Sequence, residues 1–329
     1  MSIAASTTAT VAASGAMAIS ATYHIQNHSA AVTAGGGVDV TIRSLDETDF
    51  ARAHDVICKG FSTKDFQFNI TAEDLNERLV QNGYDPRFSL GAFIEDAMIG
   101  VWLTGIRMID GARVAYCAGT AVLQDWRRMG IAQRMMDVTD ELCARTGTKK
   151  LVLTTFTNND AAISLYEKNG FHTSRSLASY RLDDPASIDH TDSRNLKPEG
   201  MDLDDVSALG STLLNYEPSW RNSWQSIEAI EHSITITSIR KGWGGKLVAY
   251  GVYQPVAGRI AQLGISMNLR ATDAQRALHA LIAHFCRNSS EVPSMEIVEI
   301  PKDADWLISR LKAAGFEQSQ DLIEMVKEY

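Results

Sequence analysis

The hexapeptide Arg127–Ala132, Arg-Arg-Met-Gly-Ile-Ala, constrains this chain more than any other segment. It lies between a strand-like run, Tyr116–Leu123, and a run from Ile131 whose apolar residues recur at helical spacing, as in a helix that packs on a sheet. A helix N-terminus presents backbone N–H groups without intrahelical partners, and Gly130 lets a ligand approach the backbone. With the positive charge of the two arginines, this strand–turn–helix unit predicts a cradle for phosphate oxygens.

A second motif follows further along the chain. Asn159 opens a short amphipathic helix that carries Tyr166, and Gly170-Phe171 follow the end of that helix. Between the two motifs, the apolar and β-branched run Lys150–Phe156 predicts a buried strand. The order strand, Arg-x-x-Gly-x-Ala, helix, strand, Asn-x-x-Ala-x-x-Leu-Tyr-x-x-x-Gly-Phe resembles the GNAT superfamily of acyl-CoA-dependent N-acyltransferases, and the resemblance covers residues 41–182.

This resemblance implies an enzyme that transfers acetyl from acetyl-CoA to a primary amine by direct attack. It implies a β-bulge in the strand that holds Gly119–Leu123, and a parting from the Leu151–Phe156 strand that exposes backbone N–H groups to the thioester. Tyr166 would act as general acid on the leaving thiolate, because a tyrosine pKa of about 10 is close to that of a thiol. The implied catalytic residues are Tyr166 and Val122 (through its N–H, as oxyanion donor), and the implied cofactor-binding residues are Ala121, Val122, Leu123, Arg127, Arg128, Met129, Gly130, Ile131, Ala132, Gln133, Asn159 and Tyr166.

The same residues also have structural interpretations. Asn159 is a suitable helix N-cap rather than a ligand of the pantetheine arm. Tyr166 is a suitable core aromatic with a satisfied hydroxyl, and Arg127 a suitable solvated charge. Val122 also has the pattern of an ordinary buried strand residue, and only its backbone N–H has an implied role in catalysis.

A general base is missing from the predicted site. An attacking amine must lose a proton, which a nearby carboxylate or a water chain usually assists. The two strands that line the site carry no Asp or Glu, and Tyr116 and Cys117 stand where some relatives have an acid. The remaining candidates are His54, Asp65, Glu95 and the terminal carboxylate at Tyr329, and none is assigned.

The rest of the first half predicts further strands and helices. Thr71 with Asp74 resembles a capping box, and Asp110-Gly111 is a strong hairpin turn. The predicted strands are Val40–Arg43, Leu90–Glu95, Met98–Met108 and Val114–Leu123, and the predicted helices are Asp46–Gly60 and a helix from Thr71 to Leu79.

The second half repeats the first in a degenerate form. Gly119 precedes Gly170 by the same spacing as Gly264 precedes Gly315, and a phenylalanine follows each downstream glycine. A repeat of this length predicts two domains of one fold, packed as a pseudo-pair. The expected class is α/β (α+β): two GNAT-like domains, each a mixed, mostly antiparallel twisted sheet flanked by helices. At constant spacing, the second copy has Thr272, Gln275 and Leu311 in place of Arg127, Gly130 and Tyr166, which predicts that it does not bind CoA in the usual way.

Composition shifts mark four segments. Residues 1–38 contain no Asp, Glu, Lys or Arg, which predicts a flexible tail, although Tyr23–Ile25 could add a short strand. A catalytic domain is predicted over 39–183 and a polar linker over 184–199. The degenerate domain is predicted over 200–329.

Composition also limits the cellular locations and the classes of binding partner that we expect. A net charge of −9 without a Lys/Arg block argues against nucleic acid as a partner. The sequence has no apolar run long enough to predict a membrane span. The four cysteines show neither disulfide nor metal-ligand spacing. The expected protein is cytoplasmic, uses acetyl-CoA as acyl donor and no metal, and is a monomer or homodimer.

The amine acceptor and two alternative functions stay open. Aromatic residues that could line an acceptor pocket are equally suited to a core. The alternatives to an acetyltransferase are an enzyme that uses a longer acyl-CoA, a catalytically silent acyl-CoA-binding regulator, and a structural scaffold that binds no CoA. The aromatic residues are Phe61, Phe66 and Phe68 in the first half and Trp220, Trp224 and Trp243 in the second.

Overall fold

The computed structural model describes residues 29–34, 38–62, 67–188, 196–210, 212–241, 245–288 and 293–329. In the first half the strands are β1 (Ser29–Ala34), β2 (Val38–Ser44), β3 (Leu90–Ile94), β4 (Ala97–Ile109), β5 (Ala112–Val122), β6 (Lys150–Phe156) and β7 (His172–Leu182). The helices of this half are α1 (Phe50–Phe61), α2 (Ala72–Gln81), α3 (Ile131–Thr146) and α4 (Asp160–Lys168).

The second half has the same kinds of element. Its strands are β8 (Pro198–Gly200), β9 (Thr235–Lys241), β10 (Lys246–Gln254), β11 (Arg259–Ile265), β12 (Met295–Pro301) and β13 (Glu317–Glu328). Its helices are α5 (Leu203–Gly210), α6 (Trp224–Glu228), α7 (Ala271–Asn288) and α8 (Asp305–Ala313).

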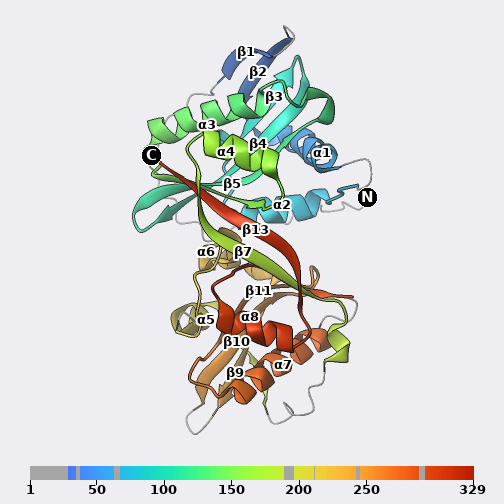
Figure 1. The fold of residues 1–329 in the computed structure, drawn as a ribbon, viewed down its shortest axis with the longest axis vertical. Helices are drawn as coiled ribbons and strands as arrows, with labels where there is room; N and C mark the ends of the chain where they lie inside the picture. The colour runs from blue at the N-terminus through green and yellow to red at the C-terminus, as the bar shows by residue number, and fades with distance from the viewer. Residues whose placement is uncertain are drawn as a thin grey trace, which may run out of the picture.

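Within the described residues, the strands form one 13-stranded sheet in the order β1-β2-β3-β4-β5-β6-β13-β7-β12-β11-β10-β9-β8. Helices pack on this twisted sheet in both halves (Figure 1). The β5–β6 and β11–β12 pairs are parallel, and the other neighbouring strands are antiparallel. The mixed, mostly antiparallel sheet flanked by helices is therefore confirmed.

Local signals in the sequence account for the element boundaries in the first half. The Thr71 hydroxyl accepts a hydrogen bond from Asp74 N at 3.0 Å and caps α2, as expected. Asp110 and Gly111 both have left-handed φ angles, 50° and 77°, which suit a two-residue hairpin turn between β4 and β5. The predicted helices and strands of this half all occur, with ends that differ by a few residues.

Two apolar layers hold the first half together. One face of the sheet packs against α3 and α4, with Met135, Leu142 and Leu151 fully buried. The opposite face packs against α1 and α2 through Ile57 and Leu79. The helix after the cradle hexapeptide is thus fixed to the sheet by its apolar face, as its periodicity predicted.

The expectation of a flexible tail over residues 1–38 is wrong for its last part. Ser29–Ala34 form β1, which pairs antiparallel with β2, from Ser29 opposite Arg43 to Ala34 opposite Val38. Without β1, β2 would be an unpaired edge strand, so the tail gains a full ladder of backbone hydrogen bonds there. The strand suggested near Tyr23–Ile25 lies outside the described residues.

The last strand of each half lies between two strands of the other half. β13 runs between β6 and β7, and β7 runs between β13 and β12. The seven residues from Leu322 to Glu328 pair with Phe156 to Lys150, so β13 completes the sheet of the first half. Figure 1 shows β7 and β13 side by side where the two halves meet.

The internal repeat is visible in the structure, but it is broken at the cradle. β12 and α8 follow β6 and α4 at one constant shift in residue number, and Gly170 and Gly315 have matching φ angles of 86° and 88°. Residues 123–130 separate β5 from α3, whereas only residues 266–270 separate β11 from α7. The constant-spacing assignment of Thr272 and Gln275 to the positions of Arg127 and Gly130 is therefore wrong, because both lie inside α7.

Candidate active site

The strands β5 and β6 part at a β-bulge, as the resemblance implied. They pair in parallel from Val114 and Lys150 to Cys117 and Leu153, and no further. At the same level the register of β5 against β4 shifts, which leaves Ala118 as an extra residue. Beyond the bulge, the backbone of β5 has β4 on one side and no strand on the other.

The bulged strand directs the Val122 N–H into this parting. Leu123 N donates to Ile99 O at 2.9 Å, and Val122 lies opposite Gly100. Hydrogen-bonded and non-hydrogen-bonded pairs alternate in an antiparallel ladder, so the Val122 N–H points away from β4. The same alternation turns the N–H groups of Ala121 and Leu123 toward β4. Of these three predicted residues, Val122 alone offers its N–H to the parting.

The loop after β5 forms an open cradle at the start of α3. Arg128 and Gly130 have left-handed φ angles of 64° and 80°, and no atom lies within 4 Å of a Cβ built on Gly130. No side chain caps α3, and its first turn holds no acidic residue. Arg134 N, which donates to Gly130 O at 3.0 Å, makes the first hydrogen bond of the helix. The N–H groups before it suit an anion.

Arg127 holds the loop after β5 in place through two hydrogen bonds. Its Nε donates to Val122 O at 3.0 Å and its Nη2 to Gly60 O at 2.5 Å. A Cβ on Gly60 would lie 2.7 Å from the Cβ of Ala121, so α1 packs tightly on β5 at this point. These two carbonyls give Arg127 a structural role in this structure, and its contact with phosphate stays a prediction.

The second motif supports the cradle from the side of α4. Asn159 is the N-cap of α4, and its Oδ1 accepts from Ala162 N at 3.4 Å. Gln133 and Asn169 exchange a reciprocal pair of amide hydrogen bonds, at 2.6 and 3.0 Å, which ties α3 to the end of α4. The capping interpretation of Asn159 is confirmed, and its exposed side chain also lies at the mouth of the parting strands.

Tyr166 points from α4 at the bulge. The residue is 8% exposed, and its hydroxyl hydrogen-bonds to Thr120, which in turn lies 3.1 Å (Oγ1) from Cys117 Sγ. Burial raises the pKa of Tyr166 above its usual value, so the expected pKa near 10 is wrong and the phenol stays protonated. Burial likewise raises the pKa of Cys117 to about 11. Thr120 was missed, although it is the single hydroxyl residue in Ala118–Val122.

Comparison with known proteins agrees with this geometry. Residues 58–171 match the acetyltransferase (GNAT) family. This part of the chain is a GNAT acetyltransferase family domain. It contains the bulge, the cradle and Tyr166.

Relatives of known sequence and structure extend this match. N-alpha-acetyltransferase 30 of Schizosaccharomyces pombe is 31% identical over 98 residues, which cover 30% of this chain and 65% of that protein. A tandem GNAT protein from the clavulanic acid biosynthesis pathway is 16% identical, covers 88% of this chain and 98% of its own, and has a TM-score of 0.67. A GCN5-related N-acetyltransferase from Sphaerobacter thermophilus is 13% identical, covers 88% and 95%, and has a TM-score of 0.67. These two structures share the fold of nearly the whole chain.

Three of the four candidates for a general base of the GNAT domain can be placed, and none lies at the bulge. His54 Nε2 bonds to Ile70 O at 2.7 Å, which makes it a structural link between α1 and the segment before α2. Glu95 is exposed in the turn between β3 and β4. Tyr329 N donates to Lys149 O, before β6 begins, so the chain end lies at the opposite end of β6 from the parting. The idea that this terminal carboxylate reaches the site is wrong. Asp65 lies outside the described residues.

The aromatic candidates lie in different surroundings. Phe61 is 44% exposed and its ring lies 5.4 Å from that of Phe68, whereas Phe66 and Trp243 lie outside the described residues. Trp220 of the second half is buried, and its ring stacks 5.1 Å from that of Tyr116 in β5. A core interpretation is therefore confirmed for Trp220, which joins the halves beneath the site.

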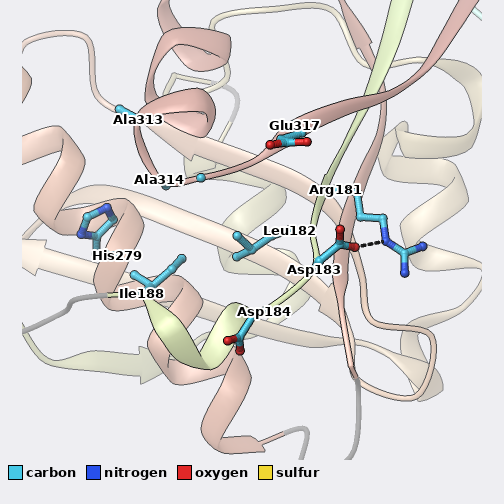
Figure 2. Close-up of a pocket in the computed structure, with 10 residues that line it drawn as sticks. Arg181, Leu182, Asp183, Asp184, Ile188, His279, Ala313, Ala314 and Glu317 are labelled. Atoms are coloured by element: carbon cyan, nitrogen blue, oxygen red, sulfur yellow. Dashed lines mark hydrogen bonds and ion pairs between the residues drawn. The ribbon is translucent and has the colours of Figure 1, made fainter.

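A cavity among the described residues lies elsewhere. It measures about 480 Å³ and opens where the end of β7 meets α7 and α8 of the second half (Figure 2). Arg181 and Asp183, an ion pair at 2.6 Å, line it together with His279 and Glu317. No residue of the cradle or the bulge lines this cavity, so it is separate from the candidate active site.

Across the described ranges, no three His, Cys, Asp or Glu side chains gather closely enough to hold a metal ion. No helix in those ranges is long and apolar enough to cross a membrane.

Proposed function

We propose that the GNAT domain transfers acetyl from acetyl-CoA to a primary amine by direct attack. The observation that carries this proposal is the meeting of two features at the end of β5. The Val122 N–H enters the parting of β5 and β6, and the uncapped start of α3 lies directly after it in the chain. One suits a developing oxyanion and the other a pyrophosphate, and an acyl-CoA in reaction has both of these charged groups.

The residues present fit this donor. The N–H groups from Arg128 to Gln133 would bind the pyrophosphate, and the open space at Gly130 leaves room for it. The unpaired edge of β5 and the Asn159 amide would bind the pantetheine arm. The Val122 N–H would stabilise the oxygen of the thioester carbonyl as the amine nitrogen attacks the carbonyl carbon.

Tyr166 would complete the reaction as general acid. As the carbon–sulfur bond breaks, the hydroxyl gives its proton to the thiolate of CoA, and the proton released by the amine restores the phenol through solvent. The raised pKa keeps this hydroxyl protonated at the start of each cycle. The products are the N-acetylated amine and CoA. A longer acyl-CoA would use the same residues with a wider space at the thioester.

We further propose that the second half does not bind acyl-CoA. Asp273 lies in the first turn of α7 and pairs with Arg270 at 3.1 Å, so a carboxylate occupies the region that a phosphate would need. The β11 strand parts from β12 after Ile260, but Tyr250 packs so closely on Gly264 that a Cβ there would lie 2.1 Å from its ring. This half would instead supply β13 and the Trp220 segment to the first.

The proposal also includes the domain limits, the cellular location and the oligomeric state. We retain a catalytic domain over 39–183, a linker over 184–199 and a degenerate domain over 200–329, with the last strands exchanged between the two. The protein would be a cytoplasmic monomer or homodimer. A silent acyl-CoA-binding regulator is the second candidate, because neither β5 nor β6 carries a carboxylate that could act as base.

Calorimetric titration of acetyl-CoA into the wild type and Gly130→Glu tests the proposal. Gly111→Glu is the matched control, since Gly111 also has a left-handed φ and open space around it but lies at the other end of β5. We expect micromolar binding to the wild type and to Gly111→Glu, and none to Gly130→Glu. Binding that survives Gly130→Glu would refute the cradle. Binding without turnover of any amine would favour the silent regulator.

A further inference from the structure

Two side chains of β5, Cys117 and Thr120, meet across the bulge of this strand. Cys117 Sγ lies 3.1 Å from Thr120 Oγ1, and the same sulfur accepts a hydrogen bond from the Gly119 N–H. In a regular strand, side chains at positions i and i+3 point to opposite faces and lie about 10 Å apart. The extra residue Ala118 removes this separation, because two residues of β5 oppose one of β4 there. The contact between Cys117 and Thr120 therefore closes the bulge.

The bulge also changes the burial of β5 and brings it to Tyr166. Val114–Cys117 are buried, whereas the following residues 118–120 are half-buried, where β6 no longer pairs with β5. The hydroxyl of the buried Tyr166 hydrogen-bonds to Thr120 from the side of α4. The Cys117 thiol, the Thr120 hydroxyl and the Tyr166 hydroxyl thus form a chain of three groups beside the parting.

Each group of this chain has a single proton to donate. Burial raises the pKa of Cys117 to about 11 and the pKa of Tyr166 above its usual value, so both groups stay protonated at neutral pH. A thiolate, in contrast, only accepts hydrogen bonds. When the thiolate of CoA lies beside Tyr166, the phenol proton turns to it, and the phenol oxygen accepts from Thr120. The Cys117 thiol then donates to the Thr120 oxygen.

The hydrogen bond from Thr120 also has an electrostatic effect on Tyr166. Burial is the largest influence on the pKa of Tyr166 and raises it, whereas the bond to Thr120 lowers it. A buried acid that gives up its proton leaves an anion, which is costly without a hydrogen-bond donor. Hydrogen bonds to a charged oxygen are also stronger than those to a neutral one. Thr120 therefore stabilises the phenolate at the moment when it forms.

Packing from the neighbouring elements fixes this chain of groups. Trp102 of β4 lies opposite Thr120 in the strand register, and it is fully buried in the same apolar layer as Cys117 and Tyr166. The centroid of the Tyr166 ring lies 5.6 Å from that of Phe171. Side chains that are held by packing and by further hydrogen bonds keep a reacting group in its productive position.

We propose that Thr120 is a positioning residue for Tyr166, and that Cys117 holds Thr120 in place. Together they orient the phenol proton toward the sulfur of CoA and stabilise the phenolate that remains. The proton passes from Tyr166 to the thiolate, while Thr120 and Cys117 keep their own protons. This inference rests on the proposed function, because it concerns the general acid of the same site.

A double-mutant cycle in the full chain tests the link between Thr120 and Tyr166. CoA release is measured at saturating acetyl-CoA with ethanolamine, benzylamine or alaninamide. Thr120→Val removes the hydroxyl and keeps the shape of the side chain, so we expect kcat to fall about tenfold with acetyl-CoA affinity unchanged. In the Tyr166→Phe background the same substitution should cost no further activity, because no phenol is left to orient. Losses that multiply in the double variant would overturn the proposal.

Conservative variants separate positioning from a loss of structure. Thr120→Ser keeps the hydroxyl and should restore most of the kcat that Thr120→Val loses. Cys117→Ala should lower kcat about threefold, because a thiol is a weak donor, and Cys117→Ser should restore it. Thr139→Val is the matched control and should keep full kcat, since it removes a buried hydroxyl of α3 that donates to Met135 O at 2.9 Å.

Thermal unfolding of each variant shows whether it is folded. A folded Thr120→Val enzyme with full kcat, or a Thr120→Ser enzyme as slow as Thr120→Val, would overturn the role of Thr120. Full kcat in Cys117→Ala would overturn the role of the thiol.

The pH dependence of binding gives a readout that needs no turnover. CoA and acetyl-CoA are titrated by calorimetry from about pH 6 to about pH 9, a range that includes the usual thiol pKa of about 8.5. A phenol proton aimed at the sulfur stabilises the thiolate of bound CoA and lowers its pKa, so CoA affinity should rise with pH. Acetyl-CoA has no thiol, and its affinity corrects for all other groups that titrate. The gain should shrink in Thr120→Val, vanish in Tyr166→Phe and persist in Thr139→Val.

The two readouts separate this inference from the proposed function. A gain in CoA affinity that depends on Thr120, without turnover of any amine, would support the positioning role and reject the acetyltransferase. Turnover that does not depend on Thr120, with an equal gain in CoA affinity in all variants, would support the enzyme and reject the positioning role.

Discussion

Replacing Tyr166 by phenylalanine isolates the proposed general acid, because only the hydroxyl leaves and the ring keeps its place. The Tyr166 ring lies 5.6 Å from that of Phe171 in the buried layer beneath α4. The fold should therefore lose only the hydrogen bond to Thr120, about 0.5–1.5 kcal/mol. General acid catalysis contributes about 10²- to 10⁴-fold. We expect kcat to fall by about 10²-fold or more, with acetyl-CoA affinity unchanged.

The pH profile gives a second readout of the same residue. Burial holds the pKa of the Tyr166 hydroxyl above its usual value of about 10. The group therefore stays protonated as the pH rises to 10, and its loss of function would begin only above that. Any fall in wild-type activity at a lower pH should persist in Tyr166→Phe. A basic limb below pH 10 that disappears in the variant would contradict the raised pKa.

The assay is CoA release at saturating acetyl-CoA, with calorimetric titration of acetyl-CoA beside it. Tyr250→Phe is the matched control, because it removes a buried hydroxyl that donates to Gln262 Oε1 at 2.9 Å in the second half. Its kcat should equal that of the wild type. A Tyr166→Phe enzyme that keeps kcat within about threefold would refute the general acid. Equal losses in both variants would indicate destabilisation instead.

Three further predictions concern the frame of the site. Trp220→Ala removes a buried ring stacked on Tyr116 and should lower the free energy of unfolding by about 3–5 kcal/mol in urea titrations, whereas an unchanged midpoint would show that the junction does not need it. Gly105→Ala would place a Cβ 2.0 Å from Asn82 O and should cost about 1–3 kcal/mol, while Gly200→Ala, with open space around it, should be near neutral. Arg127→Lys keeps the charge but cannot hold both carbonyls, so stability and acetyl-CoA affinity should fall together; full affinity in this variant would favour a phosphate contact.

Local patterns in the sequence were enough to predict the elements around the site. The periodicity after Ile131, the Thr71 cap and the Asp110-Gly111 turn each act within one element or between neighbours, and all three appear in the structure. The bulge at Ala118 followed from resemblance, since no residue pattern in β5 marks it.

Contacts between distant segments could not be predicted in this way. The residues of β13 alternate as any half-buried strand does, and nothing in them specifies β6 and β7 as partners. Arg127 was assigned to phosphate because its carbonyl partners, Gly60 and Val122, meet it only in the folded chain.

The exchange of last strands gives the second half a structural role in the first, whether or not it binds a cofactor. The first half takes from the second a whole strand, β13, and the Trp220 ring that covers Tyr116. Without the second half, β6 and β7 would each present an unpaired edge beside the reacting groups, and unpaired edges associate with other chains. The parting of β5 and β6 depends on the next strand holding β6 in place, and that strand belongs to the second half. The geometry that positions the Val122 N–H is therefore a property of both halves, although the proposed chemistry lies in one.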